Sequence, residues 1–197
     1  MQEEITMPAV KLLAFSGSSR EESFNQRLLD HAVHAAQDSG AEIEAIRLAD
    51  FNLPLYSQNL ELNAFPEDAK RLKELFRTHH GFLIASPEHN GSITTLLKNA
   101  IDWVSRPTDG EAALALTGFR GKVAGLMSTS PSPFGGLRSL SHLRQILTTI
   151  QTLVVTEQVS VPLAHTAFDG PELLDTMPKQ LLPPLVNRVI QLAKVSA

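Results

Sequence analysis

Residues 10–25 read VKLLAFSGSSREESFN and contain the first signal for the fold. The apolar run at 10–15 predicts a buried β-strand, because it is short and turn-forming residues follow it at once. From Asn25 to Ala36 apolar side chains recur every three or four residues, and Gly40 then provides a stop, which predicts an α-helix. A strand joined to a helix by a short polar loop is typical of α/β proteins.

The same alternation of strand and helix continues along the chain. Further strands are predicted at 42–48, 81–85, 122–127 and 154–161, the last with an interruption at 157–158. Helices are predicted at 66–80, 93–104, 137–150 and 182–193, the last with Pro183 and Pro184 near its start, while 49–65 is predicted to be a loop. Five strands alternating with helices predict a parallel sheet covered on both faces, in one domain spanning 1–197 with its core at about 10–195.

Composition excludes several classes of protein. The net charge is −4 and the 17 basic residues are scattered, so we expect no nucleic-acid partner. The absence of cysteine excludes disulfides, thiol redox pairs and cysteine metal clusters, and we predict no metal site. No apolar run approaches the roughly 20 residues of a membrane span, and the first residues are acidic, so we expect a cytoplasmic protein without membrane contact.

Three loops follow the carboxyl ends of predicted strands, where α/β proteins bind their ligands. They span 16–25, 86–92 and 128–136, and each is rich in Ser, Gly, Pro or Asn. The first offers backbone N–H groups, hydroxyls and the guanidinium of Arg20 at a helix N-terminus, which suits a phosphate monoester. It matches neither the Walker A pattern nor the three-glycine dinucleotide pattern. A plain turn with Ser23 or Asn25 as helix cap and a solvated Arg20 is the alternative.

The second loop combines Pro87 with Asn90 and Gly91, so a planar ring with donors and acceptors on its edge can approach the main chain closely. A tight turn with His89 on the surface is the alternative interpretation. The third loop ends in Gly135 and Gly136, which either close a ligand crevice or form a flexible connector.

Together the loops resemble the NADPH-dependent FMN reductase family, which includes chromate and quinone reductases. The resemblance covers residues 10–161 and rests on GSSREESFN (17–25), SPEHNGSITTLLKNAIDWVSRP (86–107) and the GG-L-R segment at 135–138. It implies a flavodoxin-like three-layer sandwich, in which a five-stranded parallel sheet in the order 2-1-3-4-5 carries helices on both faces.

The resemblance also implies a set of FMN-binding residues. The phosphate is expected near Ser18, Arg20, Ser23, Phe24 and Asn25, and the isoalloxazine edge near Pro87, Glu88, His89, Asn90 and Gly91. Residues 128–136, with Ser128, Ser130 and Gly135, are expected to close the flavin crevice. The chain departs from the family at His89, where Tyr is usual, and at Ser132, where Gly is usual.

The implied activity is an FMN-dependent NAD(P)H oxidoreductase that passes hydride from NADPH through flavin N5 to free flavin, a quinone, an azo compound or chromate. Hydride transfer is the cofactor's own chemistry, so no catalytic side chain is predicted. Preference for NADPH comes only from the resemblance, with Arg20, Arg106 and Arg138 as candidates to meet its 2′-phosphate.

The family works as homodimers or homotetramers in which the 49–65 region and the helix near Ser92 help to build the neighbour's flavin pocket, and we expect the same here. Two alternatives remain, a non-enzymatic flavodoxin-like FMN electron carrier and an interaction module without flavin.

Overall fold

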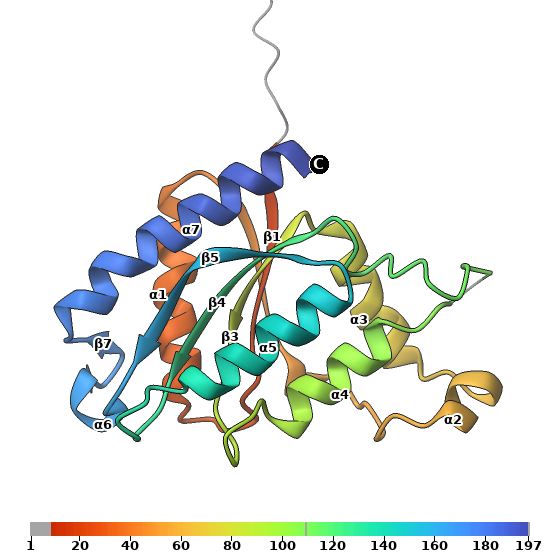
Figure 1. Ribbon diagram of the computed structural model, residues 1–197, viewed down its shortest axis with the longest axis horizontal. Coiled ribbons are helices and arrows are strands. Elements are labelled where there is room, and N and C mark those ends of the chain that lie inside the picture. Colours follow the sequence, from red (N-terminus) through yellow and green to blue (C-terminus); the bar gives the residue numbers. More distant parts are fainter. Residues whose placement is uncertain (1–8, 109, 197) are drawn as a thin grey trace, which may run out of the picture.

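A computed structural model describes residues 9–108 and 110–196 of the chain. Its centre is a parallel five-stranded sheet with the order β2-β1-β3-β4-β5, which is the order that the resemblance implies (Figure 1). The strands are β1 (Lys11–Ser16), β2 (Glu42–Arg47), β3 (Gly81–Ala85), β4 (Val123–Thr129) and β5 (Leu153–Val161). Strands β3 and β4 are buried along their whole length, whereas β2 is half exposed at the sheet edge, as its alternating pattern predicts.

Helices cover both faces of this sheet (Figure 1). On one face lie α1 (Phe24–Asp38) and α7 (Thr176–Ser196), and on the other lie α3 (Glu67–Thr78), α4 (Thr95–Val104) and α5 (Leu137–Thr149). The two faces have separate apolar cores, the first with Leu28 and Val186, the second with Phe76 and Leu140. The architecture is therefore a three-layer flavodoxin-like sandwich.

Two segments differ from the prediction. The segment 49–65, predicted as a loop, begins within a 3₁₀ turn at Leu48–Asp50 and contains the short helix α2 (Gln58–Asn63). Helix α7 begins at Thr176, not near Pro183, because the side chain of Asp175 accepts a hydrogen bond from the Met177 amide (3.1 Å) and starts the helix earlier. Pro183 and Pro184 consequently lie inside the helix, where each leaves one carbonyl of the preceding turn without its usual donor.

The fifth strand is irregular close to the predicted interruption. Ala124 pairs with Val154 but Leu126 pairs with Gln158, so β5 bulges opposite Gly125. After β5 come three short elements that no periodicity predicted, namely α6 (Ala164–Ala167), β6 (Phe168–Asp169) and β7 (Glu172–Leu173). Among the described residues, none of the helices has the length and apolar character needed to cross a membrane.

Candidate functional site

The three loops predicted to bind a ligand meet at the carboxyl ends of β1, β3 and β4. A cavity of about 100 Å³ lies between them. Its lining includes most of the predicted residues, together with Thr129 and Pro131, which the prediction covered only as part of the 128–136 loop. The full set is Ser18, Arg20, Ser23, Phe24, Asn25, Pro87, Glu88, His89, Thr129, Ser130 and Pro131. Asn90, Gly91, Ser128 and Gly135 do not line this cavity.

The first loop is held against the second at Gly17. The Gly17 amide donates to the carbonyl of Ala85 (2.9 Å), and its carbonyl accepts from the hydroxyl of Thr94 (2.6 Å). A β-carbon at Gly17 would lie 3.0 Å from the β-carbon of Leu97, so glycine permits α4 to pack closely here. The start of α4 is thereby fixed beside the loop.

An anion can be bound at the start of α1. Ser23 is the N-cap of this helix and accepts from the Gln26 amide (3.3 Å), which confirms the capping role predicted as an alternative. That cap satisfies one amide, and the amides of Phe24 and Asn25 have no acceptor within the helix. Arg20 is exposed beside them. These donors have the chemistry that suits a phosphate, and the Ser23 cap does not occupy them.

Asn25 has a structural role that the sequence did not indicate. Its side-chain amide donates to the carbonyl of Thr129 (2.8 Å), and its side-chain oxygen accepts from the Thr129 amide (3.0 Å). Asn25 is buried and therefore joins the start of α1 to the end of β4. This pair brings Thr129 into the cavity wall, next to Ser130.

The second loop ends in a tight hairpin. The amides of His89 and Ser92 donate to each other's carbonyls, both at 2.9 Å. Between them Asn90 and Gly91 adopt φ angles of 50° and 77°, which confirms the predicted unusual dihedrals. His89 and Asn90 are exposed, and His89 also lines the cavity, so the hairpin begins at the edge of the cavity.

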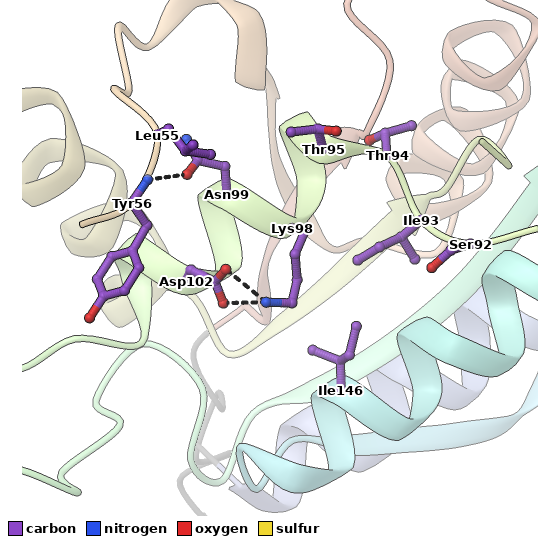
Figure 2. A pocket seen from close by; sticks show the side chains of 10 residues that line it. All are labelled: Leu55, Tyr56, Ser92, Ile93, Thr94, Thr95, Lys98, Asn99, Asp102 and Ile146. Carbon is purple, nitrogen blue, oxygen red and sulfur yellow. Dashed lines mark hydrogen bonds and ion pairs between the residues drawn. The ribbon is translucent and has the colours of Figure 1, made fainter. Parts of the chain in front are cut away.

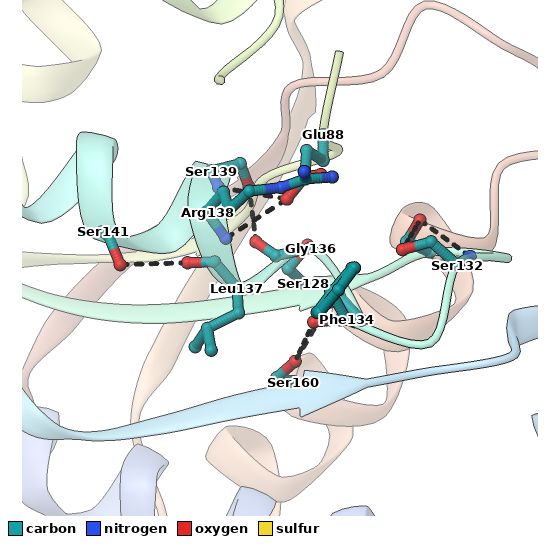
Figure 3. Close-up of polar contacts among 12 residues, drawn as sticks. Glu88, Ser128, Ser132, Phe134, Gly136, Leu137, Arg138, Ser139, Ser141 and Ser160 are labelled. Carbon is teal, nitrogen blue, oxygen red and sulfur yellow. Dashed lines mark hydrogen bonds and ion pairs between the residues drawn. The ribbon is translucent and has the colours of Figure 1, made fainter. Parts of the chain in front are cut away.

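Glu88 is attached to the N-terminus of α5 (Figure 3). Its carboxylate forms an ion pair with Arg138, whose Nε donates at 2.8 Å, and it also accepts from the amides of Arg138 (3.2 Å) and Ser139 (3.4 Å). Burial alone would raise the pKa of Glu88, but these hydrogen bonds outweigh it and lower the pKa below its ordinary value. The guanidinium considered for a 2′-phosphate is thus already paired.

The third loop is fixed at its two ends, whereas Pro131, Pro133 and Phe134 in its middle are exposed. The Ser128 hydroxyl donates to the carbonyl of Ser86 (2.6 Å), and the Ser139 hydroxyl donates to the same carbonyl (3.0 Å). Gly135 and Gly136 are buried with φ angles of 58° and 83°. The glycine pair therefore lets the loop turn closely over β4 into α5.

A larger cavity of about 450 Å³ lies beside the hairpin, between α4, α5 and the 55–56 segment (Figure 2). Its floor carries the ion pair of Lys98 with Asp102 (2.7 Å). Asn99 accepts from the Tyr56 amide (2.8 Å), which holds the 55–56 segment against α4. Two segments that border this cavity, 49–65 and the helix near Ser92, were predicted to take part in a flavin pocket only through the family resemblance.

Comparison with known proteins identifies the group to which this chain is related. The sequence profile of the NADPH-dependent FMN reductase family matches residues 10–166. The chain belongs to this family. Family membership makes it an NAD(P)H-dependent flavin oxidoreductase with FMN and NADPH as cofactors, and it confirms the enzyme over the electron-carrier alternative.

Individual members of the family agree with this assignment. An NAD(P)H-dependent FMN reductase of Pseudomonas aeruginosa is 35% identical over 176 residues, which cover 88% of this chain and 89% of the relative. An NAD(P)H:quinone oxidoreductase of Solanum tuberosum is 39% identical over 142 residues, covering 71% and 68%. The solved structure of a Paracoccus denitrificans NAD(P)H:(acceptor) oxidoreductase shares the fold, with a TM-score of 0.78 at 24% identity and coverage of 95% and 98%.

Proposed function

We propose that the chain is a single FMN-binding unit that reduces a quinone-type acceptor with NADPH. The observation that supports it best is that the exposed Arg20, the first residues of α1, the start of the 89–92 hairpin and residues 129–131 line one cavity at one edge of the sheet. Relatives that cover much of the chain are quinone oxidoreductases by name, including the one from potato. Bound FMN would supply hydride acceptance at N5 and return of two electrons to the acceptor.

The chain's own residues then have binding roles. Arg20 and the first amides of α1 would hold the phosphate, and Ser18 shapes the loop by accepting from the Arg20 amide (3.2 Å). The main chain of residues 89–91 would contact the ring edge. The cavity of about 100 Å³ is smaller than the roughly 300–1,000 Å³ typical of small-molecule sites, so most of the ring would lie outside it.

That small volume also supports the expectation of a homodimer or homotetramer. A second copy would cover a ring left open by one chain, and the 49–65 region and α4 lie next to the hairpin.

A cytoplasmic location remains our prediction, and cell fractionation with an antibody tests it.

The decisive measurement is the visible spectrum of the purified protein before and after anaerobic NADPH. Bleaching of a flavin band establishes cofactor and donor together, and a protein without a flavin band even after added FMN would contradict the proposal. Reoxidation of the bleached protein by benzoquinone, free FMN, chromate or an azo dye, each added separately, then ranks the acceptors. Benzoquinone is expected to react fastest.

A further inference from the structure

Helix α5 begins without a cap of its own. Its N-cap is Gly136, which has no side chain, and its first turn contains no acidic residue. The first amides of a helix require acceptors, and the positive end of the helix dipole favours an anion there. The acceptors for these amides must therefore come from water or from another part of the chain.

Glu88 supplies these acceptors from the second loop. Its carboxylate accepts from the amides of Arg138 and Ser139, the second and third residues of α5, and its side chain is 5% exposed. With the guanidinium of Arg138 also bonded to it, both carboxylate oxygens are engaged. Glu88 is therefore not available to donate to or accept from a ring edge.

Arg138 extends the same contact to the tip of the hairpin. A β-carbon at Gly91 would lie 3.8–3.9 Å from the Nε, Cδ and Cζ atoms of Arg138, so the end of the Arg138 side chain packs next to the hairpin backbone. The Cζ atom of Arg138 also lies 5.2 Å from the ring centroid of Phe134 in the third loop. One ion pair thus connects the second loop, the third loop and the start of α5.

We propose that Glu88 is a positioning residue: by binding the N-terminus of α5 it fixes the hairpin at residues 89–92 in the conformation that receives the flavin ring. The inference rests on the proposed assignment of that hairpin to the ring. It changes the role of Glu88 from a ring contact to a support for the main chain of its neighbours.

The test compares Glu88→Ala with Arg138→Ala and with a matched control, Glu74→Ala. Glu74 accepts from the guanidinium of Arg77 through both carboxylate oxygens (2.7 and 2.6 Å), on the exposed surface of α3 and away from the three loops. Glu88→Ala removes the acceptor for both the guanidinium and the two helix amides, whereas Arg138→Ala leaves the two amide bonds in place. We expect hairpin opening and the loss of FMN affinity to be largest in Glu88→Ala, smaller in Arg138→Ala and smallest in the control.

Amide hydrogen exchange of the protein without FMN is the first readout. The His89 and Ser92 amides are bonded within the hairpin, so their exchange reports its opening. Both are expected to exchange at least several-fold faster in Glu88→Ala than in the control. Faster exchange at the Arg138 and Ser139 amides alone, with the hairpin unchanged, would reduce Glu88 to a helix cap and overturn the proposal.

FMN affinity, measured by fluorescence titration, is the second readout. Glu88→Ala is expected to weaken FMN binding roughly tenfold, the order expected when hydrogen bonds to a charged group are lost. Wild-type affinity in that variant would contradict the proposal. If the wild-type protein itself bound no FMN, the proposed function would fail, while the exchange experiment would still decide whether Glu88 orders the hairpin. Should Glu88→Ala not fold, Glu88→Gln, which keeps one acceptor oxygen, replaces it.

Discussion

Arg20 is the side chain on which the phosphate assignment depends most directly. It is exposed beside the amides of Phe24 and Asn25, which have no acceptor within α1. Replacing it by alanine should weaken FMN binding by about 1.5–3 kcal/mol, the scale of a charge-assisted hydrogen bond, and leave the fold intact. Fluorescence titration measures the affinity, with Arg120→Ala at the opposite end of the sheet as control. Equal affinities of the two variants would remove Arg20 from the site.

Asn25 is expected to matter more for stability than for binding. The Asn25→Ala change leaves the buried amide and carbonyl of Thr129 without partners, and we expect a loss of about 2–4 kcal/mol in the free energy of unfolding. Urea denaturation measures it. The control is Asn63→Ala, because Asn63 is exposed and makes one bond, to the carbonyl of Asn59 (2.9 Å). A loss no larger than that of the control would contradict the bridging role.

At the level of elements, the entry into α5 depends on Gly136. Its φ is 83°, and a β-carbon there would overlap the Ser128 hydroxyl. Gly121 is a matched control, since its φ is 76° but a β-carbon there would meet no atom within 4 Å. Gly121→Ala should cost about 1–2 kcal/mol from backbone strain alone. Gly136→Ala should cost about 1–3 kcal/mol more from overpacking, measured by urea denaturation. Equal losses would show that β4 accommodates the added methyl group.

The sequence predicted the elements that carry their own periodicity and missed those that depend on distant contacts. The apolar run at 81–85 matches β3 residue for residue, because a central parallel strand needs apolar side chains on both faces. Asn25 and Thr129, in contrast, are 104 positions apart, and no local pattern connects them. Pro183 was misleading because local propensity places proline at helix starts, whereas here the Asp175 side chain caps the helix at Thr176, so that Pro183 lies inside α7.

The candidate site was predicted in the same uneven way. Loop composition indicated which three loops form the candidate site, since serine, glycine and asparagine mark the carboxyl ends of the strands. It did not indicate what each side chain does, because that depends on which helix the loop meets in space. Glu88 was assigned to the ring, yet its carboxylate lies on the first amides of α5, some 50 residues further along the chain.

For the molecule as a whole, stability should decrease in mild acid through His80. Its Nδ1 accepts from the Lys11 amide (3.0 Å), and burial first, then the charges of Lys122, His79 and Lys11, lower its pKa, opposed by Glu42. The unfolded chain therefore takes up the proton before the folded one does. The contribution is complete above about pH 6.5 and is lost as the pH falls below it. Urea denaturation from pH 7.5 to 5 measures the slope, and His80→Asn should reduce it; identical slopes would contradict the assignment.

The assembly is the remaining property of the whole molecule, and its prediction rests on exposed leucines beside the larger cavity. Leu55, which lines the larger cavity, and Leu62 in α2 are 74% and 72% exposed on the segment between β2 and α3, so a second copy that packs on this segment would cover both. We expect light scattering to show at least a dimer, and Leu55→Asp with Leu62→Asp to shift it toward monomer and weaken FMN binding. Leu114→Asp is the control, since Leu114 is equally exposed, at 74%, on the loop after α4. A double variant that keeps the wild-type mass would place the interface elsewhere. If it became monomeric with FMN affinity unchanged, one chain would hold the flavin alone, and the small cavity at its loops would have to open when FMN binds.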